Sequence, residues 1–423
     1  MAGFALRTQL GVASAATQIE GGHADTIWHR WAAERGRVRD GSAPTRAADH
    51  WNRFEADTAL LADLGIRHYR LGLEWARIEP SPGHFDTDAI DHYRAELTGL
   101  RAAGVRPLVT LWHFNDPGWF GDAGGWLGAE AVNRYVRYVH RVVTALRDLV
   151  DDWVTVNEPN VYAVNGHLFG EWPPGHRSLP EAVRVMSTLA AAHIAAYGAI
   201  HQIQPGATVC VADHRRRFTP KDPRNPYHRA CAATLDHLFQ GALTEAMLTG
   251  RFPLPLRAPR GVRPGRYADV IGLNYYSRGT ISCPGDAAAT GVPVNDLGWE
   301  IHPAGLVAEA RRMHRRHPLP LWVTENGTAD AADSFRARFI HDHLAAIAAS
   351  ELPFERYYHW CFTDNWEWAE GEVPRFGLVD LDYATQLRTP RASARFYSDA
   401  IANGAVTEEA HERWVAPQSY KIG

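Results

Sequence analysis

The stretch Trp153-Val-Thr-Val-Asn157-Glu158-Pro159 decides the fold. Its β-branched apolar residues are typical of a buried strand, and Pro159 ends that strand directly after an acidic side chain. Glu158 is therefore predicted to lie at the carboxyl end of a strand. The stretch Leu319-Pro-Leu-Trp-Val-Thr324-Glu325-Asn326-Gly327 has the same form, an apolar strand that ends in a carboxylate and is followed by a glycine turn.

Two glutamates at strand ends are the groups that glycoside cleavage requires. In the retaining reaction one carboxylate attacks the anomeric carbon while the other protonates the leaving oxygen, and the two lie about 5–5.5 Å apart. A single glutamate at a strand end is usually a solvated loop residue. The interpretation therefore depends on Glu158 and Glu325 occurring together in one fold.

Apolar runs of strand length alternate with helix-like segments along the whole chain, which is typical of βα units around a parallel sheet. Strands are expected at 10–15, 68–73, 106–111, 153–156, 208–212, 270–273, 321–324 and 357–362. Helices are expected at 51–64, 90–103, 131–149, 181–203, 228–249, 305–317, 335–350 and 392–402. Because no linker separates these units, we predict a single α/β domain over residues 1–423. It is a (β/α)8 TIM barrel with its active site at the carboxyl ends of the strands.

The composition argues against several classes of partner. The 423 residues are 45% hydrophobic and carry a net charge of −4, so no nucleic acid is expected as a partner. No apolar run approaches the ~18 residues of a membrane span and the N-terminus lacks a signal pattern, so we expect a cytoplasmic protein without a membrane partner. The four cysteines, at 210, 231, 283 and 361, are widely scattered, which argues against a disulfide framework and a structural zinc.

Histidine is abundant, with 22 residues, but its distribution does not predict a metal site. The histidines are dispersed, and those at strand ends lack the i, i+4 spacing of a helical zinc site. His341 and His343 are two residues apart and would point to different faces of a helix. No metal and no other cofactor are therefore expected.

Polar and aromatic side chains follow nearly every predicted strand. Such residues can hold sugar hydroxyls or stack on sugar rings, and the carboxyl ends of barrel strands meet at one face. In chain order they include Gln18, Arg70, His113, Asn157, Glu158, Asn274, Tyr276, Glu325, Trp360, Glu367 and Trp368.

With these residues in view, the chain resembles glycoside hydrolase family 1, the β-glucosidase and β-galactosidase family, over essentially its whole length. The resemblance rests on Gly11-Val-Ala-Ser-Ala-Ala-Thr-Gln18-Ile-Glu-Gly, Tyr69-Arg70-Leu-Gly-Leu-Glu-Trp, Val109-Thr-Leu-Trp-His113-Phe, Thr155-Val-Asn157-Glu158-Pro, Gly272-Leu-Asn274-Tyr-Tyr276, Val323-Thr-Glu325-Asn-Gly, Trp360-Cys-Phe-Thr-Asp-Asn-Trp-Glu367-Trp368 and Arg375-Phe376-Gly-Leu. It implies a retaining β-glycosidase that acts at the nonreducing end through a covalent glycosyl-enzyme. Glu158 would be the acid/base and Glu325 the nucleophile, and the substrate a small-molecule or oligosaccharide β-glycoside.

The same resemblance implies roles for the surrounding residues. Arg70, Asn274 and Tyr276 would support the nucleophile. The residues implied to bind substrate are Gln18, His113, Asn157, Trp299, Trp360, Glu367, Trp368 and Phe376, among which Gln18 and Glu367 would clamp sugar hydroxyls, Trp360 would form the floor and Trp299 would carry the leaving group. A guanidinium near Glu325 should keep it ionised, whereas burial should raise the pKa of Glu158.

The chain departs from the family pattern at a few positions. Where the family usually has His-Trp-Asp, this chain has His113-Phe114-Asn115, and His167 and His302 stand where tyrosines are common. We expect these changes to affect preferences for the leaving group and not the two glutamates.

Several other functions remain open from the sequence. A 6-phospho-β-glycosidase is disfavoured because Glu367 would repel a phosphate and the only lysines are Lys221 and Lys421, far from this region. A noncatalytic sugar-binding protein is disfavoured because both acids are present. A transglycosylase differs only in whether an alcohol or water intercepts the glycosyl-enzyme, which the sequence does not decide. The preferred sugar and the oligomeric state are likewise not predicted.

Overall fold

The computed structural model describes residues 3–282, 286–287 and 289–423, and in it eight parallel strands close into a barrel. Around the ring they are β2 (Gln9–Ala13), β3 (His68–Gly72), β4 (Arg106–Thr110), β5 (Asp152–Asn157), β6 (Thr208–Pro220), β7 (Ile271–Ile281), β10 (Leu321–Gly327) and β11 (Phe354–Trp360). Pairing of β10 with β7 on one side and β11 on the other, and of β11 with β2, completes the ring. The predicted (β/α)8 barrel is confirmed.

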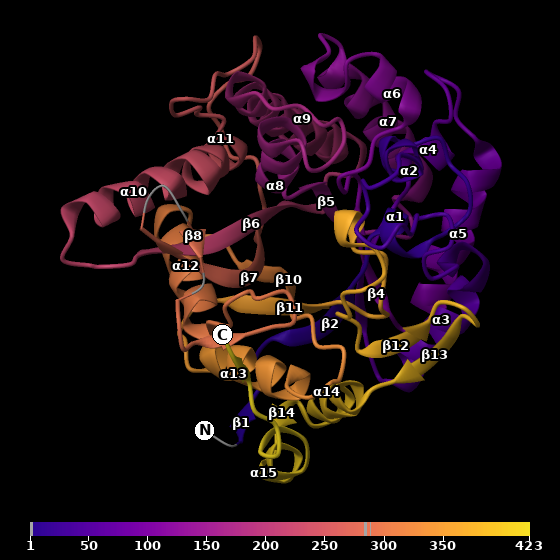
Figure 1. Cartoon of the computed structure of the whole chain (residues 1–423). Coiled ribbons are helices and arrows are strands. Elements are labelled where there is room, and N and C mark those ends of the chain that lie inside the picture. The colour runs from indigo at the N-terminus through magenta and orange to yellow at the C-terminus, as the bar shows by residue number, and fades with distance from the viewer. Residues whose placement is uncertain (1–2, 283–285, 288) are drawn as a thin grey trace.

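Helices surround the strands, as the view along the barrel in Figure 1 shows. The long ones are α3 (His50–Asp63), α5 (Thr87–Ala102), α7 (Ala131–Leu146), α9 (Leu179–Ile203), α10 (Pro226–Asp236), α11 (Ala242–Thr249), α12 (Pro303–Arg316), α13 (Arg336–Ala348) and α14 (Ala392–Asn403). Their bounds follow the expected ranges closely, except that a π-helical turn, η3 (His237–Gly241), divides the helix expected at 228–249 into α10 and α11.

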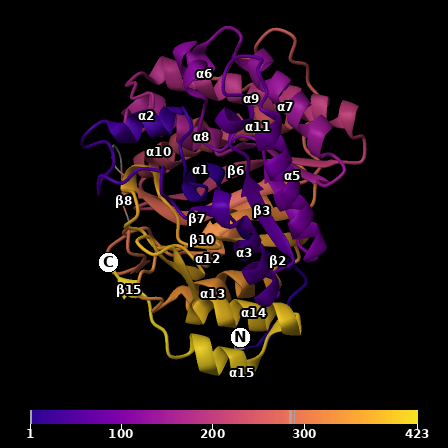
Figure 2. The same ribbon diagram turned by 90° about the vertical axis from the view of Figure 1, so that its right-hand side faces the viewer.

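The remaining elements are short. They are β1 (Phe4–Ala5), α1 (Ala16–Ile19), α2 (Ile27–Ala33), α4 (Trp75–Ile78), α6 (Gly118–Asp122), η1 (Gly125–Leu127), α8 (Pro159–Ala163), η2 (Val164–Phe169), β8 (Asp286–Ala287), β9 (Pro293–Val294), η4 (Trp368–Glu370), β12 (Val379–Asp382), β13 (Leu387–Pro390), β14 (Ala405–Val406), α15 (Glu408–Ala410), η5 (His411–Val415) and β15 (Lys421–Ile422). In Figure 2 the N-terminus lies beside α14 and α15, where β1 pairs with β14.

Burial on both faces explains why the barrel strands read as continuous apolar runs. Every residue of β5 and of β10 is buried, since side chains fill the barrel on one side and helices cover the other. The helices present one apolar face to the barrel; on α7 this face carries Tyr135, Tyr138, Val139, Val142 and Leu146. Side-chain caps fix helix starts, as where Asp86 accepts from the backbone N–H of Asp88 at 2.8 Å.

A buried aspartate forms two ion pairs at the amino ends of the strands. Asp152, at the start of β5, accepts from Arg106 Nε at 2.6 Å and from Arg356 Nη1 at 2.7 Å. Polar groups at this end of a barrel stabilise the fold, whereas the chemistry takes place at the opposite end.

Two strands are longer than the sequence indicated. Residues 208–212 and 270–273 were expected, but β6 and β7 continue to pair with each other beyond the barrel, as far as Pro220 with Ile281. The later residues of β7 alternate between buried and partly exposed, and residues 216–220 of β6 are all partly exposed, so neither extension has the continuous apolar run of a barrel strand. The extension places Asp213 and His214 within β6, at the rim of the barrel.

Two expectations drawn from composition need correction. Helix α9, with 25 residues and a mean hydropathy of 1.3, is long and apolar enough to span a membrane by length and composition alone. It is 67% buried over its most apolar window and packs as a core helix against α7 and α11.

Cys231 is disulfide-bonded, whereas Cys210 and Cys361 are buried free thiols and Cys283 lies outside the described residues. Scattered spacing did not predict this bond because the fold, not the sequence distance, brings cysteines together.

Candidate active site

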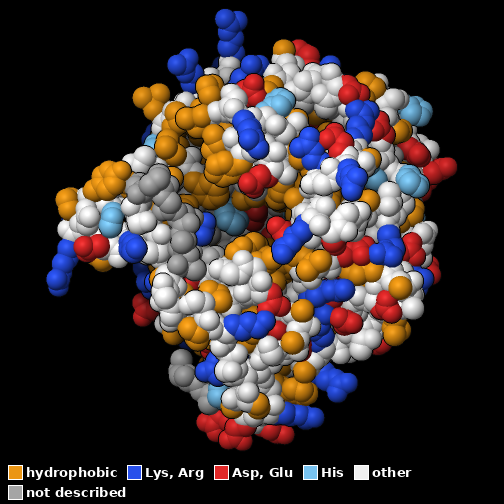
Figure 3. Space-filling model, in the orientation of Figure 1, with side chains coloured by type: hydrophobic (Ala, Val, Ile, Leu, Met, Phe, Trp, Pro, Cys, Tyr) orange, Lys and Arg blue, Asp and Glu red, His pale blue; other side chains and the backbone are white. Residues whose placement is uncertain are grey.

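A pocket of about 330 Å³ opens at the carboxyl ends of the barrel strands. Figure 3 shows it as a hollow near the centre of the molecular face, with hydrophobic side chains gathered around it. Both strand-end glutamates line it. The full lining is His113, Phe114, Glu158, Val161, Asn165, Trp172, His214, Arg216, Tyr276, Ser277, Trp299, Glu325, Trp360, Glu367, Trp368 and Phe376.

Glu158 is placed by an abrupt turn from strand to helix. It follows β5, adopts a left-handed backbone conformation with φ 42° and ψ 57°, and precedes Pro159, the first residue of α8. A positive φ is uncommon for a residue other than glycine, and proline is favoured at the first position of a helix. Its backbone N–H donates to Ala212 O of β6 at 2.8 Å, so the turn stays attached to the barrel.

Glu158 is 5% exposed. Its carboxyl group contacts two polar neighbours through the same oxygen. Asn274 Nδ2 donates to Glu158 Oε1 at 2.8 Å, and His214 Nδ1 lies 2.9 Å from that oxygen. Both neighbours come from adjacent strands, β7 and β6. The second oxygen, Oε2, accepts no hydrogen bond from the described part of the chain.

Glu325, on β10, is held through both of its oxygens. Arg70 Nη1 donates to Oε1 at 2.5 Å, and the hydroxyl of Tyr276 donates to Oε2 at 2.6 Å. Arg70 is fully buried, and its Nε also donates to Thr110 Oγ1 at 3.0 Å. Hydrogen bonds from a guanidinium and a phenol fix the orientation of the carboxylate and favour its charged form.

A buried chain of hydrogen bonds connects the two glutamates. Arg70, which holds Glu325, donates through Nη2 to Asn157 Oδ1 at 2.7 Å. Asn274 Nδ2 donates to the same Asn157 oxygen at 3.0 Å and also to Glu158. Arg70, Asn157 and Asn274 are each fully buried behind the lining of the pocket. Glu158 and Glu325 are therefore fixed relative to each other by side chains from three strands, β3, β5 and β7.

Burial changes the protonation of Glu325. Desolvation raises the pKa of Glu325 to about 7; the Arg70 guanidinium opposes this rise, and the negative charge of Glu158 adds to it. The expectation that a guanidinium keeps Glu325 ionised is therefore wrong, because the effect of burial on the pKa of Glu325 is larger than that of Arg70. Near pH 7, Glu325 in the free protein is divided between its two forms.

Glu367 and Gln18 form a second polar cluster at the pocket. Trp360 Nε1 donates to Glu367 Oε1 at 3.2 Å, and Gln18 Nε2 donates to Glu367 Oε2 at 3.3 Å. Burial raises the pKa of Glu367 to about 8. Gln18 is fully buried and lies behind Glu367.

Two buried polar atoms in this region lack protein partners. Gln18 Nε2 also donates to Asn365 Oδ1 and to Trp366 O, both at 3.0 Å, which orients the amide and leaves Oε1 unpaired among the described residues. His113 Nε2 lies 2.9 Å from Asn157 Nδ2, so it accepts, and the ring proton is on Nδ1. That Nδ1 also has no partner within the described chain. Burial lowers the pKa of His113, so the ring is neutral.

Aromatic rings form the walls. Trp368 lies nearly parallel to the His113 ring, with centroids 5.8 Å apart. At the mouth, Trp299 packs against Tyr276 and Phe376 at 5.9 and 6.0 Å and remains 39% exposed. The inner part of the pocket therefore offers polar groups and flat rings, and the mouth offers an accessible indole.

The sequence model of glycosyl hydrolase family 1 matches residues 4–264 and 265–405. The chain belongs to this family. It is 30% identical to β-glucosidase A of Thermotoga maritima over 94% of this chain and 97% of that protein. It is 31% identical to a chloroplastic galactolipid galactosyltransferase of Arabidopsis thaliana over 85% of this chain and 58% of that protein. The structure of the T. maritima β-glucosidase in complex with deoxynojirimycin superposes with a TM-score of 0.87 at 27% identity, covering 95% of this chain and 99% of that chain.

Membership of family 1 confirms the resemblance drawn from the sequence motifs and makes the protein an enzyme of the glycosidase class. The structure brings every residue proposed for the site to one end of the barrel. Those that line the pocket of this family 1 enzyme are His113, Glu158, Tyr276, Trp299, Glu325, Trp360, Glu367, Trp368 and Phe376. Gln18, Arg70, Asn157 and Asn274 form a buried layer behind them.

Sequence reasoning missed two prominent residues of the family 1 pocket. His214 was overlooked because the strand was expected to end at Ala212; the rule that polar residues following a strand face the site would have found it. Trp172 gave no signal, since it lies in a loop after η2 and reaches the pocket by packing on Phe114 and Trp368. Asn115, noted as a departure from the family, turns away from the pocket and donates to Glu74 Oε2 at 2.8 Å.

Proposed function

We propose that this family 1 enzyme is a retaining β-glycosidase of β-glucosidase type that releases the nonreducing-end sugar. The observation that carries the proposal is that Glu158 and Glu325 line one pocket and are joined by the chain of Arg70, Asn157 and Asn274. A retaining reaction needs two carboxyl groups fixed on either side of one sugar ring.

In the first step, ionised Glu325 attacks the anomeric carbon as the bond to the leaving oxygen breaks. Glu158 donates its proton to that oxygen, so the leaving group departs as a neutral alcohol and the sugar becomes an ester of Glu325. In the second step Glu158, now a carboxylate, takes a proton from water, and that water displaces Glu325. Two inversions at the same carbon return the original configuration.

The contacts support this division of roles. Both oxygens of Glu325 accept bonds from Arg70 and Tyr276, which favours a carboxylate. Glu158 has bonds at one oxygen only, which leaves Oε2 available to carry and deliver a proton. Asn274 and His214 position Glu158 through Oε1.

Hydroxyls of the nonreducing-end sugar would be bound by Glu367, Gln18, His113 and Asn157, with Trp360 as the floor. The two unpaired atoms, Gln18 Oε1 and His113 Nδ1, offer one acceptor and one donor, which is what hydroxyl groups can satisfy. The T. maritima β-glucosidase, which has the same fold, binds deoxynojirimycin, a small sugar mimic. A 6-phosphate is disfavoured because Glu367 is a carboxyl group and neither Lys221 nor Lys421 lines the pocket.

Replacing Glu325 by glycine tests the proposal directly. Glu325→Gly should abolish hydrolysis of p-nitrophenyl β-glucoside, and azide should restore turnover because it fits the vacated space, giving the inverted α-glycosyl azide. Glu158→Gly is the matched control; with an activated leaving group, azide should intercept the glycosyl-enzyme and give the β-glycosyl azide. If both variants gave the same anomer, or neither were rescued, the assigned roles would be wrong.

A transglycosylase is the second candidate, because a galactolipid galactosyltransferase is among the relatives. The distinction lies in what resolves the glycosyl-enzyme. Incubating the enzyme with p-nitrophenyl β-galactoside and rising concentrations of an alcohol or galactolipid acceptor, and comparing released sugar with transferred sugar, measures the partition. Predominant transfer at low acceptor concentration would favour this second function.

A further inference from the structure

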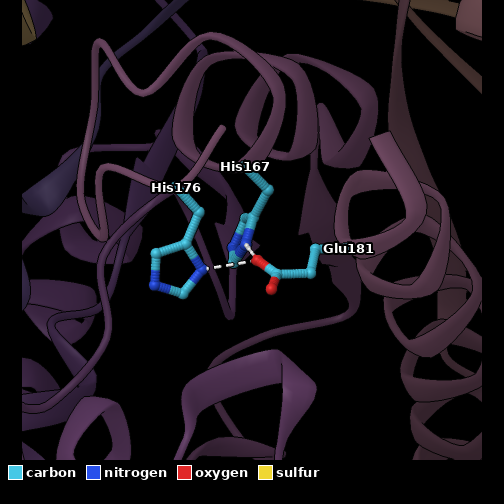
Figure 4. Close-up of side chains that lie close together, drawn as sticks. All are labelled: His167, His176 and Glu181. Carbon is cyan, nitrogen blue, oxygen red and sulfur yellow. Dashed lines mark hydrogen bonds and ion pairs between the residues drawn. The ribbon is translucent and has the colours of Figure 1, made fainter. Parts of the chain in front are cut away.

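Three potential metal ligands converge beside the pocket wall, on residues that take no part in the proposed reaction. Glu181 Oε2 lies 2.7 Å from His176 Nδ1 and 4.0 Å from His167 Nδ1. The ligand atoms of all three residues lie within 4.8 Å of one another. Figure 4 shows the side chains meeting from separate segments, with both histidines directed at the glutamate.

His167 is the unusual member of this cluster. It is 3% exposed, and neither of its ring nitrogens has a hydrogen-bond partner in the described parts of the chain. Buried polar atoms are normally paired, so an imidazole with both nitrogens free is a candidate for a ligand.

The dimensions of the cluster fit a transition metal ion. Nitrogen and carboxylate ligands bind Zn²⁺ at about 2.0–2.2 Å in a tetrahedron, which places ligand atoms about 3.4 Å apart. The observed separations of 2.7 and 4.0 Å lie on either side of that value. Two imidazoles and one carboxylate are a common zinc ligand set that leaves a fourth position open. The side chains of His176 and Glu181 are 44% and 39% exposed, so an ion and water can reach them.

We propose that His167, His176 and Glu181 bind a divalent transition metal ion, Zn²⁺ foremost, with water at the open position. The ion joins three segments: η2, which carries His167, the loop 170–178, which carries His176, and the first turn of α9, which carries Glu181. This proposal departs from the expectation of no metal. Spacing could not reveal these ligands, since they come from different segments instead of from one helix.

The site would fix part of the wall of the active-site pocket. Asn165 in η2 and Trp172 in the loop both line the pocket. The loop is already attached to η2 by backbone bonds, from Trp172 N to Asn165 O at 3.3 Å and from His176 N to Gly166 O at 2.9 Å. A bound ion adds a side-chain connection at the same place, so it restrains the segment that holds the Trp172 indole.

Calorimetric titration of the metal-free protein with ZnCl2 tests the proposal. The protein is dialysed against EDTA, the chelator is removed, and binding is measured in a buffer that does not chelate zinc. We expect one tight ion per chain and a rise of several degrees in the thermal midpoint at saturating Zn²⁺. Co²⁺ at the same site should give the visible absorption of a tetrahedral complex.

Two variants remove ligands in different ways. His167→Phe keeps a buried ring of similar size but loses both nitrogens, and Glu181→Gln keeps the size of a partly exposed side chain but removes its charge. Loss of a direct ligand should weaken binding at least ~100-fold, because changes beyond the ligands already cost about 10- to 100-fold. His140→Gln, at an exposed position of α7, is the matched control and should bind as the unaltered protein does.

The alternative is that His176 and Glu181 form only an ion pair beside an unused histidine. Wild-type protein without a saturable one-to-one site would establish that alternative, as would Zn²⁺ affinity unchanged in both ligand variants. These measurements do not depend on glycoside turnover, so they stand or fall independently of the proposed catalytic roles.

Discussion

Removing the hydroxyl of Tyr276 would change the protonation of Glu325 with little other disturbance. In Tyr276→Phe, Glu325 Oε2 loses the donor that lies 2.6 Å away and keeps Arg70 on Oε1. A hydrogen bond to a charged group contributes about 1.5–3 kcal/mol, and 1.36 kcal/mol corresponds to one pKa unit. Water in the pocket replaces part of the bond, so we expect the pKa of Glu325 to rise by about one unit, from about 7 to about 8.

The assay must report Glu325 alone, in its proposed role as nucleophile. A 2,4-dinitrophenyl 2-deoxy-2-fluoro-β-glucoside traps the glycosyl-enzyme, and its leaving group needs no protonation, so the acid limb of the inactivation rate reflects ionisation of Glu325. The rate rises as pH increases through the pKa because only the carboxylate attacks. A one-unit shift lowers the ionised fraction at pH 7 about fivefold, and the rate at pH 7 with it.

A neighbouring tyrosine provides the control. The hydroxyl of Tyr275 donates to His302 O at 2.9 Å, and this residue does not line the pocket. Tyr275→Phe should therefore leave the acid limb where it is in the unaltered enzyme. An acid limb that is unmoved, or moves to lower pH, in Tyr276→Phe would refute the conclusion that the Tyr276 hydroxyl stabilises the ionised form of Glu325.

Three further outcomes follow from the site. Glu158→Ala should slow glycosides with poor leaving groups far more than activated aryl glycosides, since only the former need a proton; equal losses in kcat/KM would remove Glu158 from the acid role. Glu367 has a pKa of about 8 in the folded chain and a usual value of 4.5, so its contribution to stability is lost as pH rises through about 8. The thermal midpoint of Glu367→Gln minus that of the wild type should therefore increase between pH 5 and pH 9. A difference between the two midpoints that does not change with pH would contradict this. Trp299→Ala should raise KM about two- to tenfold for aromatic leaving groups while leaving glycosyl fluorides unaffected, as kinetics on both substrates would show.

The barrel was predictable because its physical causes are local. Strands buried on both faces must be apolar throughout, and runs such as 153–156 and 321–324 stand out against helices of period 3.6. The two glutamates were found because a proline or a glycine turn marks the strand end beside each. The extensions of β6 and β7 could not be foreseen, because these strands are held by pairing with each other instead of by an apolar run.

Much of the site depends on contacts that a sequence does not display. Asn157 accepts hydrogen bonds from Arg70 and Asn274, which are far from it in the chain. The ligand atoms of His167, His176 and Glu181 come together because the chain turns between η2 and α9, although these residues are close in sequence. The protonation of Glu325 depends on how completely the fold buries it, which no motif reports. Sequence patterns indicate which side chains reach the site, whereas the fold determines how they are coupled.

The unpaired atoms Gln18 Oε1 and His113 Nδ1 have a consequence for selectivity. A sugar that lacks a hydroxyl for one of them would leave that atom dehydrated and unbonded in the complex, at a cost of about 1–3 kcal/mol, or roughly 5- to 150-fold in kcat/KM. Deoxy sugars would thus have a lower kcat/KM because they lack a hydroxyl group. Discrimination of this kind needs no steric barrier, and it would persist in any relative that widened its entrance but preserved these two atoms.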